Sequence, residues 1–388
     1  MVAGVLVRPE PSPPRDSARG QAGRSRRRVW WVLVAWTAGW AVVHTPGGGY
    51  SWHYFSLAAR LLTGSGPSAG LHVYSAHPEL QMGPLAMLVA VPIRALDPTL
   101  AYFVAPLLLT VTGPLLLAGL VRARDQLVAR TSPLLLLSTG LLLLPVWTEV
   151  TTHYAHLDDV LAMAFAAGAA VAARYGSAPA TGLLLAAAVD AKPWAAGFAA
   201  LLLVLPHHRR AAASAVLALG VAAAWLPFVL GDPGTLSLTH FSIDNVDDSA
   251  LRALGVTTAG TPSWDRPAQL ALGLTAALFA LRRGRWQHVL LVVVAARLLL
   301  DPQTYPYYTS GLVLAAAVAD LLTRERRLPL WTLATASWYV VNELALPFAP
   351  AEALGLLRLV VCVGILLAVG APTAARHRQP SARGARNA

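Results

Sequence analysis

Long apolar runs dominate this chain and recur along almost its whole length. They are about 15 to 23 residues long and extend from residue 29 to residue 371. A helix needs roughly 20 apolar residues to cross about 30 Å of hydrocarbon. Only 13% of the 388 residues are charged and 56% are hydrophobic, which is more apolar surface than one water-soluble core of this length needs. The sequence therefore predicts an all-α, polytopic membrane helix bundle.

The two ends of the chain differ from its apolar middle. Residues 1–28 are rich in Pro, Arg and Ser, so we expect a disordered, basic cytoplasmic tail. Residues 372–388 should form a second basic cytoplasmic tail. Residues 29–371 then make up one transmembrane domain, whose first span acts as an uncleaved signal anchor.

Arginines lie in short clusters between the apolar runs. The formal net charge is +11, but these clusters form neither an amphipathic face nor a soluble basic domain, so nucleic acid is not an expected partner. Lys and Arg are retained on the cytoplasmic side in short loops. We therefore expect a multi-pass plasma-membrane protein with a cytoplasmic N-terminus. Most acidic, histidine and tyrosine residues then lie on the external face, where we place the active site.

The number of spans depends on residues 83–121. The run at 83–95 is short, and Asp97-Pro98 separates it from a run at 99–121. If both cross the membrane, the arginines at 122–130 cannot be cytoplasmic. Either one run is re-entrant or interfacial, or the arginine rule fails here. We expect about 11–13 transmembrane or re-entrant helices.

Residues 45–82 form the first expected external loop. The apolar positions of its segment WHYFSLAARLL share one helical stripe, which predicts an interfacial helix: Phe55, Leu57, Ala58, Leu61 and Leu62. His53, Tyr54 and Glu79 are polar groups of this loop that could contact a substrate, or could instead anchor it at the membrane surface.

Lys192 is the only lysine in a chain that otherwise uses arginine. It lies in AAAVDAKPWAAGF, an apolar stretch that Pro193 must break. A compact ammonium at membrane depth indicates a functional site, because freed backbone groups must line something polar. The alternative is a lysine that extends to the interface beside Asp190.

The segment TEVTTHYAHLDDVLAMAF brings polar residues to the outer end of a span. His156 and Asp159 share a helix face, whereas the adjacent Asp158 and Asp159 should point in different directions. Helix capping, substrate contact and metal ligation are all open for these aspartates. Cys362 is the only cysteine, which excludes a thiolate metal site, and we expect neither a metal nor a cofactor.

A second polar segment, ARLLLDPQTYPYYTSG, lies near the other end of the chain. Arg297 and Asp301 are one helical turn apart, so they can pair with each other. Tyr305 and Tyr307 follow and could contact a substrate or form an aromatic belt.

These motifs, in this order, resemble the polyprenyl-phosphate-mannose-dependent glycosyltransferases of family 87, within the C-type membrane glycosyltransferase superfamily. The likeness covers residues 29 to about 322 and rests on WHYFSLAARLLTG, GPLAMLVAVP, HLDDVLAMAF, AKPW and DPQTYPYY. It implies a hexosyltransferase that moves mannose from a polyprenyl-phosphate donor to a lipid or glycan acceptor at the outer face. Membrane lipids are its other expected partners.

The resemblance also implies roles for particular residues. Lys192 matches the lysine of the family's break and would bind the donor phosphate together with Arg297. His53, Asp158 and Asp159 would lie near the reacting sugar. The other expected substrate-binding residues are Tyr54, His156, Asp301, Tyr305 and Tyr307. Such a reaction needs a base for the acceptor hydroxyl and a cation for the departing phosphate.

The chain departs from the family pattern at two positions. No acid lies between residues 17 and 78, where the family carries an Asp in its first loop, and Tyr307 stands where the family has a His. His53 is then a candidate base, with Glu79, Asp158 and Asp159 as further candidates. The departures leave open a non-catalytic relative that binds or translocates a lipid-linked sugar. A secondary transporter is a third alternative, which would need paired broken helices in two halves, whereas one clear break is evident at Lys192.

Overall fold

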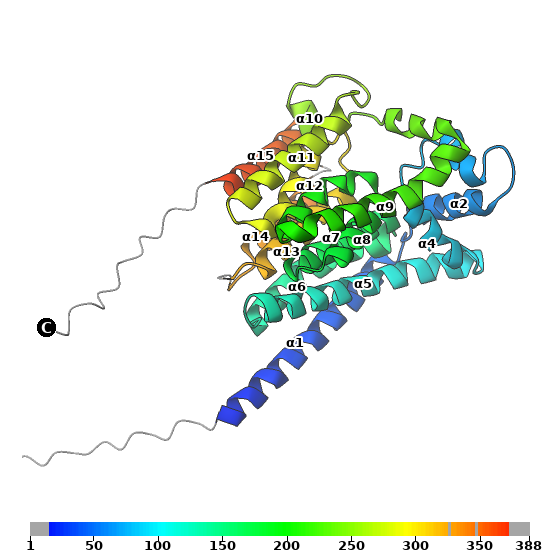
Figure 1. Cartoon of the computed structure of the whole chain (residues 1–388). Helices are drawn as coiled ribbons and strands as arrows, with labels where there is room; N and C mark the ends of the chain where they lie inside the picture. Colours follow the sequence, from blue (N-terminus) through cyan, green and yellow to red (C-terminus); the bar gives the residue numbers. More distant parts are fainter. Residues whose placement is uncertain (1–14, 325–326, 346–347, 372–388) are drawn as a thin grey trace, which may run out of the picture.

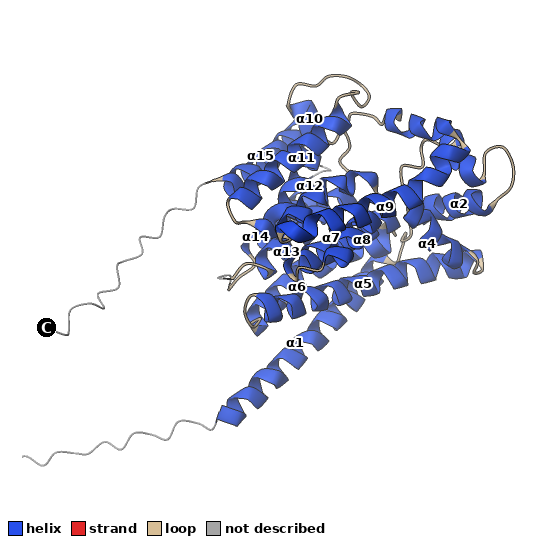
Figure 2. Cartoon of the chain, in the orientation of Figure 1, coloured by secondary structure: helices blue, strands red, loops and turns tan. Residues whose placement is uncertain are grey.

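The described part of the chain is built from helices. The computed structural model describes residues 15–324, 327–345 and 348–371. Figure 2 shows helices joined by loops, and the only β-bridge among these residues is an isolated one between Asp244 and Gly260. The predicted all-α class is therefore confirmed. The C-terminal tail expected at 372–388 lies outside the described residues.

Fifteen α-helices and five shorter or irregular helices follow one another along the described residues. In chain order they are α1 (Arg15–His44), α2 (Trp52–Thr63), η1 (Gly70–His72), α3 (Val73–Ala76), α4 (Pro84–Arg94), α5 (Pro98–Leu127), α6 (Pro133–Thr148), η2 (Glu149–His153), α7 (Leu157–Arg174), α8 (Ala178–Ala191), η3 (Pro193–Val204), α9 (His207–Gly231), η4 (Pro233–His240), α10 (Ala250–Ala253), α11 (Asp265–Arg282), η5 (Trp286–His288), α12 (Val289–Leu300), α13 (Pro306–Leu321), α14 (Leu330–Ala345) and α15 (Ala351–Gly370).

Four of the described helical segments are long and apolar enough to cross a membrane: Pro98–Leu127, Pro133–His153, His207–Gly231 and Ala351–Gly370. They make the chain compatible with a membrane protein. Other apolar helices are shorter; α4, for example, has 11 residues and spans only about 16 Å. The number of crossings, the cytoplasmic N-terminus and the external face of the site remain predictions.

The apolar surface of α9 is largely exposed. Only 11% of its most apolar stretch is buried, although that stretch has a mean hydropathy of 2.1. Leu219, Leu226 and Leu230 point outward and are at least half exposed. Contiguous apolar surface of this kind is rare on water-soluble monomers, and it suits contact with lipid.

The core lies around α12 and α13, near the middle of the bundle in Figure 1. Every residue from Val289 to Leu299 is buried, as is every residue from Leu312 to Leu321. A helix that is apolar on all sides needs neighbours on all sides. α12 packs against α11, α13 and α15, while α7, α8 and α9 pack against one another in sequence.

Two expectations for the N-terminal region need adjustment. α1 begins at Arg15, so the second half of the tail expected to be disordered is helical, and residues 1–14 lie outside the described part. The helix predicted over WHYFSLAARLL is present as α2, but its buried stripe is Trp52, Phe55, Ala58 and Ala59. The stripe is rotated because α2 packs against α4.

Candidate functional site

The predicted break at Lys192 is present and is packed against a second loop. α8 ends at Ala191, Lys192 is extended with φ −152° and ψ 116°, and the 3-10 helix η3 begins at Pro193. The Gly83 N–H donates a hydrogen bond of 2.8 Å to the carbonyl of Ala191. A Cβ on Gly83 would lie 2.1 Å from the backbone oxygen of Asp190. Position 83, the first residue of the GPLAM segment, therefore has to be glycine, because its backbone contacts the break at Lys192.

A π-helix and a left-handed residue redirect the chain just before α7. The five residues of η2, Glu149–His153, are π-helical, and Ala155 has a φ of +48°. Positive φ is strained for a residue with a Cβ, and π-helical turns occur frequently at functional sites. This local geometry starts α7 at Leu157 and leaves Asp158 and Asp159 in its first turn.

Both aspartates of the DD pair face Lys192. The Lys192 Nζ lies 2.5 Å from Asp159 Oδ2 and 3.2 Å from Asp158 Oδ2. All three side chains are buried. The expectation that the adjacent aspartates point in different directions is therefore wrong, because one ammonium attracts both carboxylates. The i,i+3 relation between His156 and Asp159 is correct, with 3.1 Å between His156 Nδ1 and Asp159 Oδ2.

The Lys192 cluster, as we name it, consists of six buried titratable side chains: His156, Asp158, Asp159, Lys192, Arg297 and Asp301. His156 Nδ1 also lies 2.6 Å from Asp158 Oδ1. The predicted pair of Arg297 and Asp301 forms at 3.2 Å, and Arg297 lies 3.9 Å from Asp159. Segments separated by more than 100 residues in the sequence therefore meet in one charged network.

Aromatic rings surround the two cations of this cluster. The Arg297 guanidinium lies 4.3 Å from the ring centre of Trp194 and 4.2 Å from that of Tyr308. Tyr307 stacks on His156 with ring centres 3.7 Å apart. A planar guanidinium between aromatic faces is held both by packing and by cation–π attraction. The partnership of Trp194 with Arg297 was not predicted, although Trp194 follows Lys192 and Pro193 directly.

The charges of the Lys192 cluster nearly balance. Its three aspartates carry three negative charges when ionised, and Lys192 and Arg297 carry two positive ones. One negative charge remains if His156 is neutral, and none remains if it is protonated. Burial makes such balance necessary, since an unpaired charge in a low-dielectric interior costs several kcal/mol.

Exposed aromatic residues form a rim outside the cluster. Tyr305 stacks on Tyr307 at 5.1 Å and is 44% exposed. Tyr54 of α2 is 48% exposed and lies beside His53, with ring centres 3.9 Å apart. A cavity of about 10 Å³, room for about one water, lies inside the rim and is lined in part by Asp159 and Arg297. This cavity is too small to hold a sugar.

Two predicted catalytic residues lie outside the charged network. His53 Nδ1 lies 2.8 Å from the backbone oxygen of Tyr50, in hydrogen-bond contact. Glu79 lies 3.1 Å from His77 Nδ1, and among the described residues it forms no ion pair with the Lys192 cluster. Of the candidate bases, only Asp158 and Asp159 are in direct contact with Lys192.

Comparison with known proteins adds no relatives. No family model matches the chain, and neither a curated protein nor a solved structure matches it. The resemblance to polyprenyl-phosphate-mannose-dependent glycosyltransferases therefore stays a prediction based on the order of short motifs.

Proposed function

We propose that this chain is a membrane hexosyltransferase that moves a sugar from a polyprenyl-phosphate donor to a lipid or glycan acceptor. Mannose is the sugar that the motif resemblance implies, and the outer face of the plasma membrane is the expected side. The observation that carries the proposal is the Lys192 cluster itself. It combines buried carboxylates, two cations and an aromatic rim within one helix bundle.

Each part of this cluster suits one requirement of the reaction. A carboxylate of Asp158 or Asp159 would accept the proton of the acceptor hydroxyl as that oxygen bonds to the anomeric carbon of the sugar. The bond between that carbon and the phosphate oxygen breaks, and the lipid phosphate leaves with the electron pair. Lys192 and Arg297 would balance the added negative charge.

The rim supplies a place for the donor. Tyr54 and Tyr305 are both nearly half exposed, and Tyr305 stacks on Tyr307, which touches His156. Flat aromatic surfaces with a polar edge suit the apolar faces and hydroxyl groups of a sugar. The apolar helices beside the rim suit the polyprenyl chain, which stays in lipid.

Sugar transfer in membranes tests the proposal. Membranes that contain the chain receive radiolabelled polyprenyl-phosphate mannose and their endogenous acceptors. We expect labelled product from wild type and from Asp232→Asn, a control at a partly exposed loop carboxylate outside the Lys192 cluster. The double variant Lys192→Met with Asp159→Asn removes one charge of each sign and should make no product. Full activity of the double variant would rule out the cluster as the reaction site.

The pairing of both cations favours a second candidate function. Lys192 already contacts two carboxylates and Arg297 contacts Asp301, so neither is free for a phosphate until a carboxylate moves or is protonated. A protein that only binds or translocates a lipid-linked sugar could use such a network as a switch. Wild type that binds the donor lipid but never makes labelled product, with every acceptor fraction tested, would support this function.

A further inference from the structure

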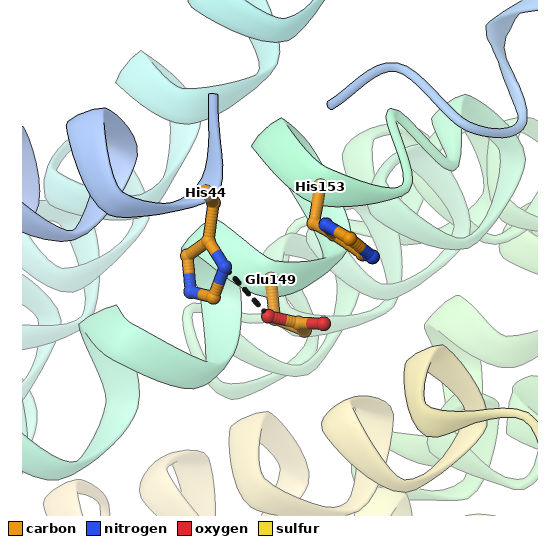
Figure 3. Close-up of side chains that lie close together, drawn as sticks. All are labelled: His44, Glu149 and His153. Carbon is orange, nitrogen blue, oxygen red and sulfur yellow. Dashed lines mark ion pairs between the residues drawn. The ribbon is translucent and has the colours of Figure 1, made fainter. Parts of the chain in front are cut away.

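A second cluster of titratable side chains lies where the end of α1 meets η2, the segment that precedes α7. We name it the His44 cluster: His44 at the end of α1, and Glu149 and His153 of η2. Figure 3 shows the three side chains together. His44 Nδ1 lies 2.9 Å from Glu149 Oε2, and each residue offers a ligand atom within 4.8 Å of the other two.

The spacing of the residues in η2 accounts for this meeting of side chains. Glu149 and His153 are four residues apart, so both lie on the side of η2 that faces α1. His44 is the last residue of α1, and its ring stacks on Trp40 with ring centres 5.5 Å apart. The ring of His153 lies 6.0 Å from that of His44.

The His44 cluster lacks the cation that the Lys192 cluster contains. In the described part of the chain, Glu149 forms no ion pair with Lys or Arg; its partner is His44. A second carboxylate, Glu343 of α14, repels Glu149 electrostatically, while Arg358 attracts Glu343. The side chains of His44 and Glu149 are 16% and 18% exposed, so a small ion can reach them. A divalent cation between the two imidazoles would compensate the charge of the Glu149 carboxylate.

We propose that His44, Glu149 and His153 bind one divalent transition-metal ion, with zinc as the best fit. Two imidazoles and a carboxylate are ligands of the zinc class, and zinc sites with three protein ligands keep a fourth position open. Tetrahedral bonds of about 2.1 Å hold ligand atoms about 3.4 Å apart, so small side-chain rotations suffice here. Mg²⁺ and Ca²⁺ prefer oxygen ligands and should not compete.

The ion would connect two distant parts of the chain. It would join the end of α1 to the segment that leads through Tyr154 and Ala155 to Asp158. A ligand that binds only the folded state stabilises that state. Metal binding does not depend on sugar transfer, so this proposal and the proposed function can fail separately.

Metal binding by the purified full chain provides the test. The protein is kept in detergent with its affinity tag removed, and zinc is titrated in competition with a chelating dye. We expect about one zinc ion per chain for wild type and for His72→Ala. That control removes an imidazole that contacts Asp232, outside the His44 cluster. His44→Ala and His153→Ala should each weaken binding at least tenfold, and Mg²⁺ should not displace zinc.

Glu149→Gln and cobalt complete the experiment. Glu149→Gln preserves the shape of the side chain and removes its charge, so it should lose affinity without unfolding the protein. Co²⁺ in the wild-type site should give the visible absorption of a tetrahedral complex, and His153→Ala should lose it. Zinc binding that stays within twofold of wild type in all three variants would overturn the proposal, as would wild type that binds no zinc at micromolar concentration.

Discussion

The Lys192 cluster and the His44 cluster differ in the source of their positive charge. Each offers three potential metal ligands: His156, Asp158 and Asp159 in one, and His44, Glu149 and His153 in the other. In the Lys192 cluster the three ligand residues are buried, and an ammonium of the same chain lies 2.5 Å from a carboxylate. In the His44 cluster they are partly exposed, and no Lys or Arg pairs with Glu149 within the described residues.

Burial explains why the two clusters differ in the source of their positive charge. A fully buried group of acids must have its countercharge present when the chain folds, since water cannot compensate for it later. A partly exposed group of acidic and histidine side chains can bind an ion from solution after the chain has folded. The Lys192 cluster thus has its countercharge within the fold, and we propose that it acts on a substrate, whereas we propose that the His44 cluster takes its countercharge from a bound ion.

The largest expected effect comes from removing the ammonium. Lys192→Met leaves Asp158 and Asp159 buried without their principal cation, which should cost about 3–5 kcal/mol of the free energy of unfolding. Thermal unfolding can be followed with a thiol-reactive dye, because the single cysteine, Cys362, is buried in the folded chain. Arg60→Met, at an exposed position of α2, is the control and should unfold at the wild-type temperature. An equal Tm for Lys192→Met and wild type would contradict the importance of the ion pairs.

The same substitution should make the two clusters alike. Without Lys192, the ligand set His156, Asp158 and Asp159 lacks its nearest cation, and Arg297 remains 3.9 Å from Asp159, so the set can accept a metal ion. Zinc per chain should rise from about one in wild type to about two in Lys192→Met, and zinc should raise the Tm of the variant more than that of wild type. Lys192→Met with Asp159→Asn lacks one ligand and should return to about one zinc. An unchanged zinc count in Lys192→Met would show that the ammonium is not what excludes metal.

A smaller effect is expected at the aromatic support of Arg297. Trp194→Leu removes one of the two rings that hold the guanidinium and should lower the free energy of unfolding by about 1–2 kcal/mol. Trp264→Leu, in which an exposed tryptophan of a loop is changed, is the matched control. Zinc binding at the His44 cluster should be the same in both variants. Equal stability of the two variants would mean that Trp194 does not support Arg297.

The smallest expected effect is on stability and concerns Asp232, which lies outside both clusters. It can be tested by changing the pH. Hydrogen bonds from Ser75, His72 and the Gly234 N–H lower the pKa of Asp232 to about 2. The unfolded value is about 3.9, so this stabilisation is fully present above about pH 4 and is lost as pH falls through about 2. The small difference in Tm between wild type and Asp232→Asn should therefore shrink over that range. A difference that grows with acidification would contradict this sign.

Local features of the site could be predicted from the sequence. The break at Lys192 follows from Pro193, and the pairing of Arg297 with Asp301 follows from helical spacing. The helix α2 follows from the apolar pattern of its residues. Each of these depends on residues within a few positions of one another, where backbone geometry decides the outcome.

Long-range contacts could not be predicted in this way. No periodic pattern in the sequence predicts the π-helix η2 or the positive φ of Ala155. Both lie directly before Asp158 and Asp159, whose carboxylates contact Lys192. The meeting of His44 with Glu149 depends on how α1 packs against η2. Spacing within one segment says nothing about which distant segment supplies the partner charge.

Transfer of mannose by the purified chain tests the role of the Lys192 cluster most directly. Wild type, Asp158→Asn and Asp159→Asn are reconstituted in lipid with polyprenyl-phosphate mannose and an acceptor extract. A general base contributes about 10²–10⁴ in rate, so at least one of the two variants should lose about 100-fold in turnover and still bind the donor within a few-fold of wild type. Turnover near the wild-type rate in both variants would contradict the assignment of the reaction to this cluster.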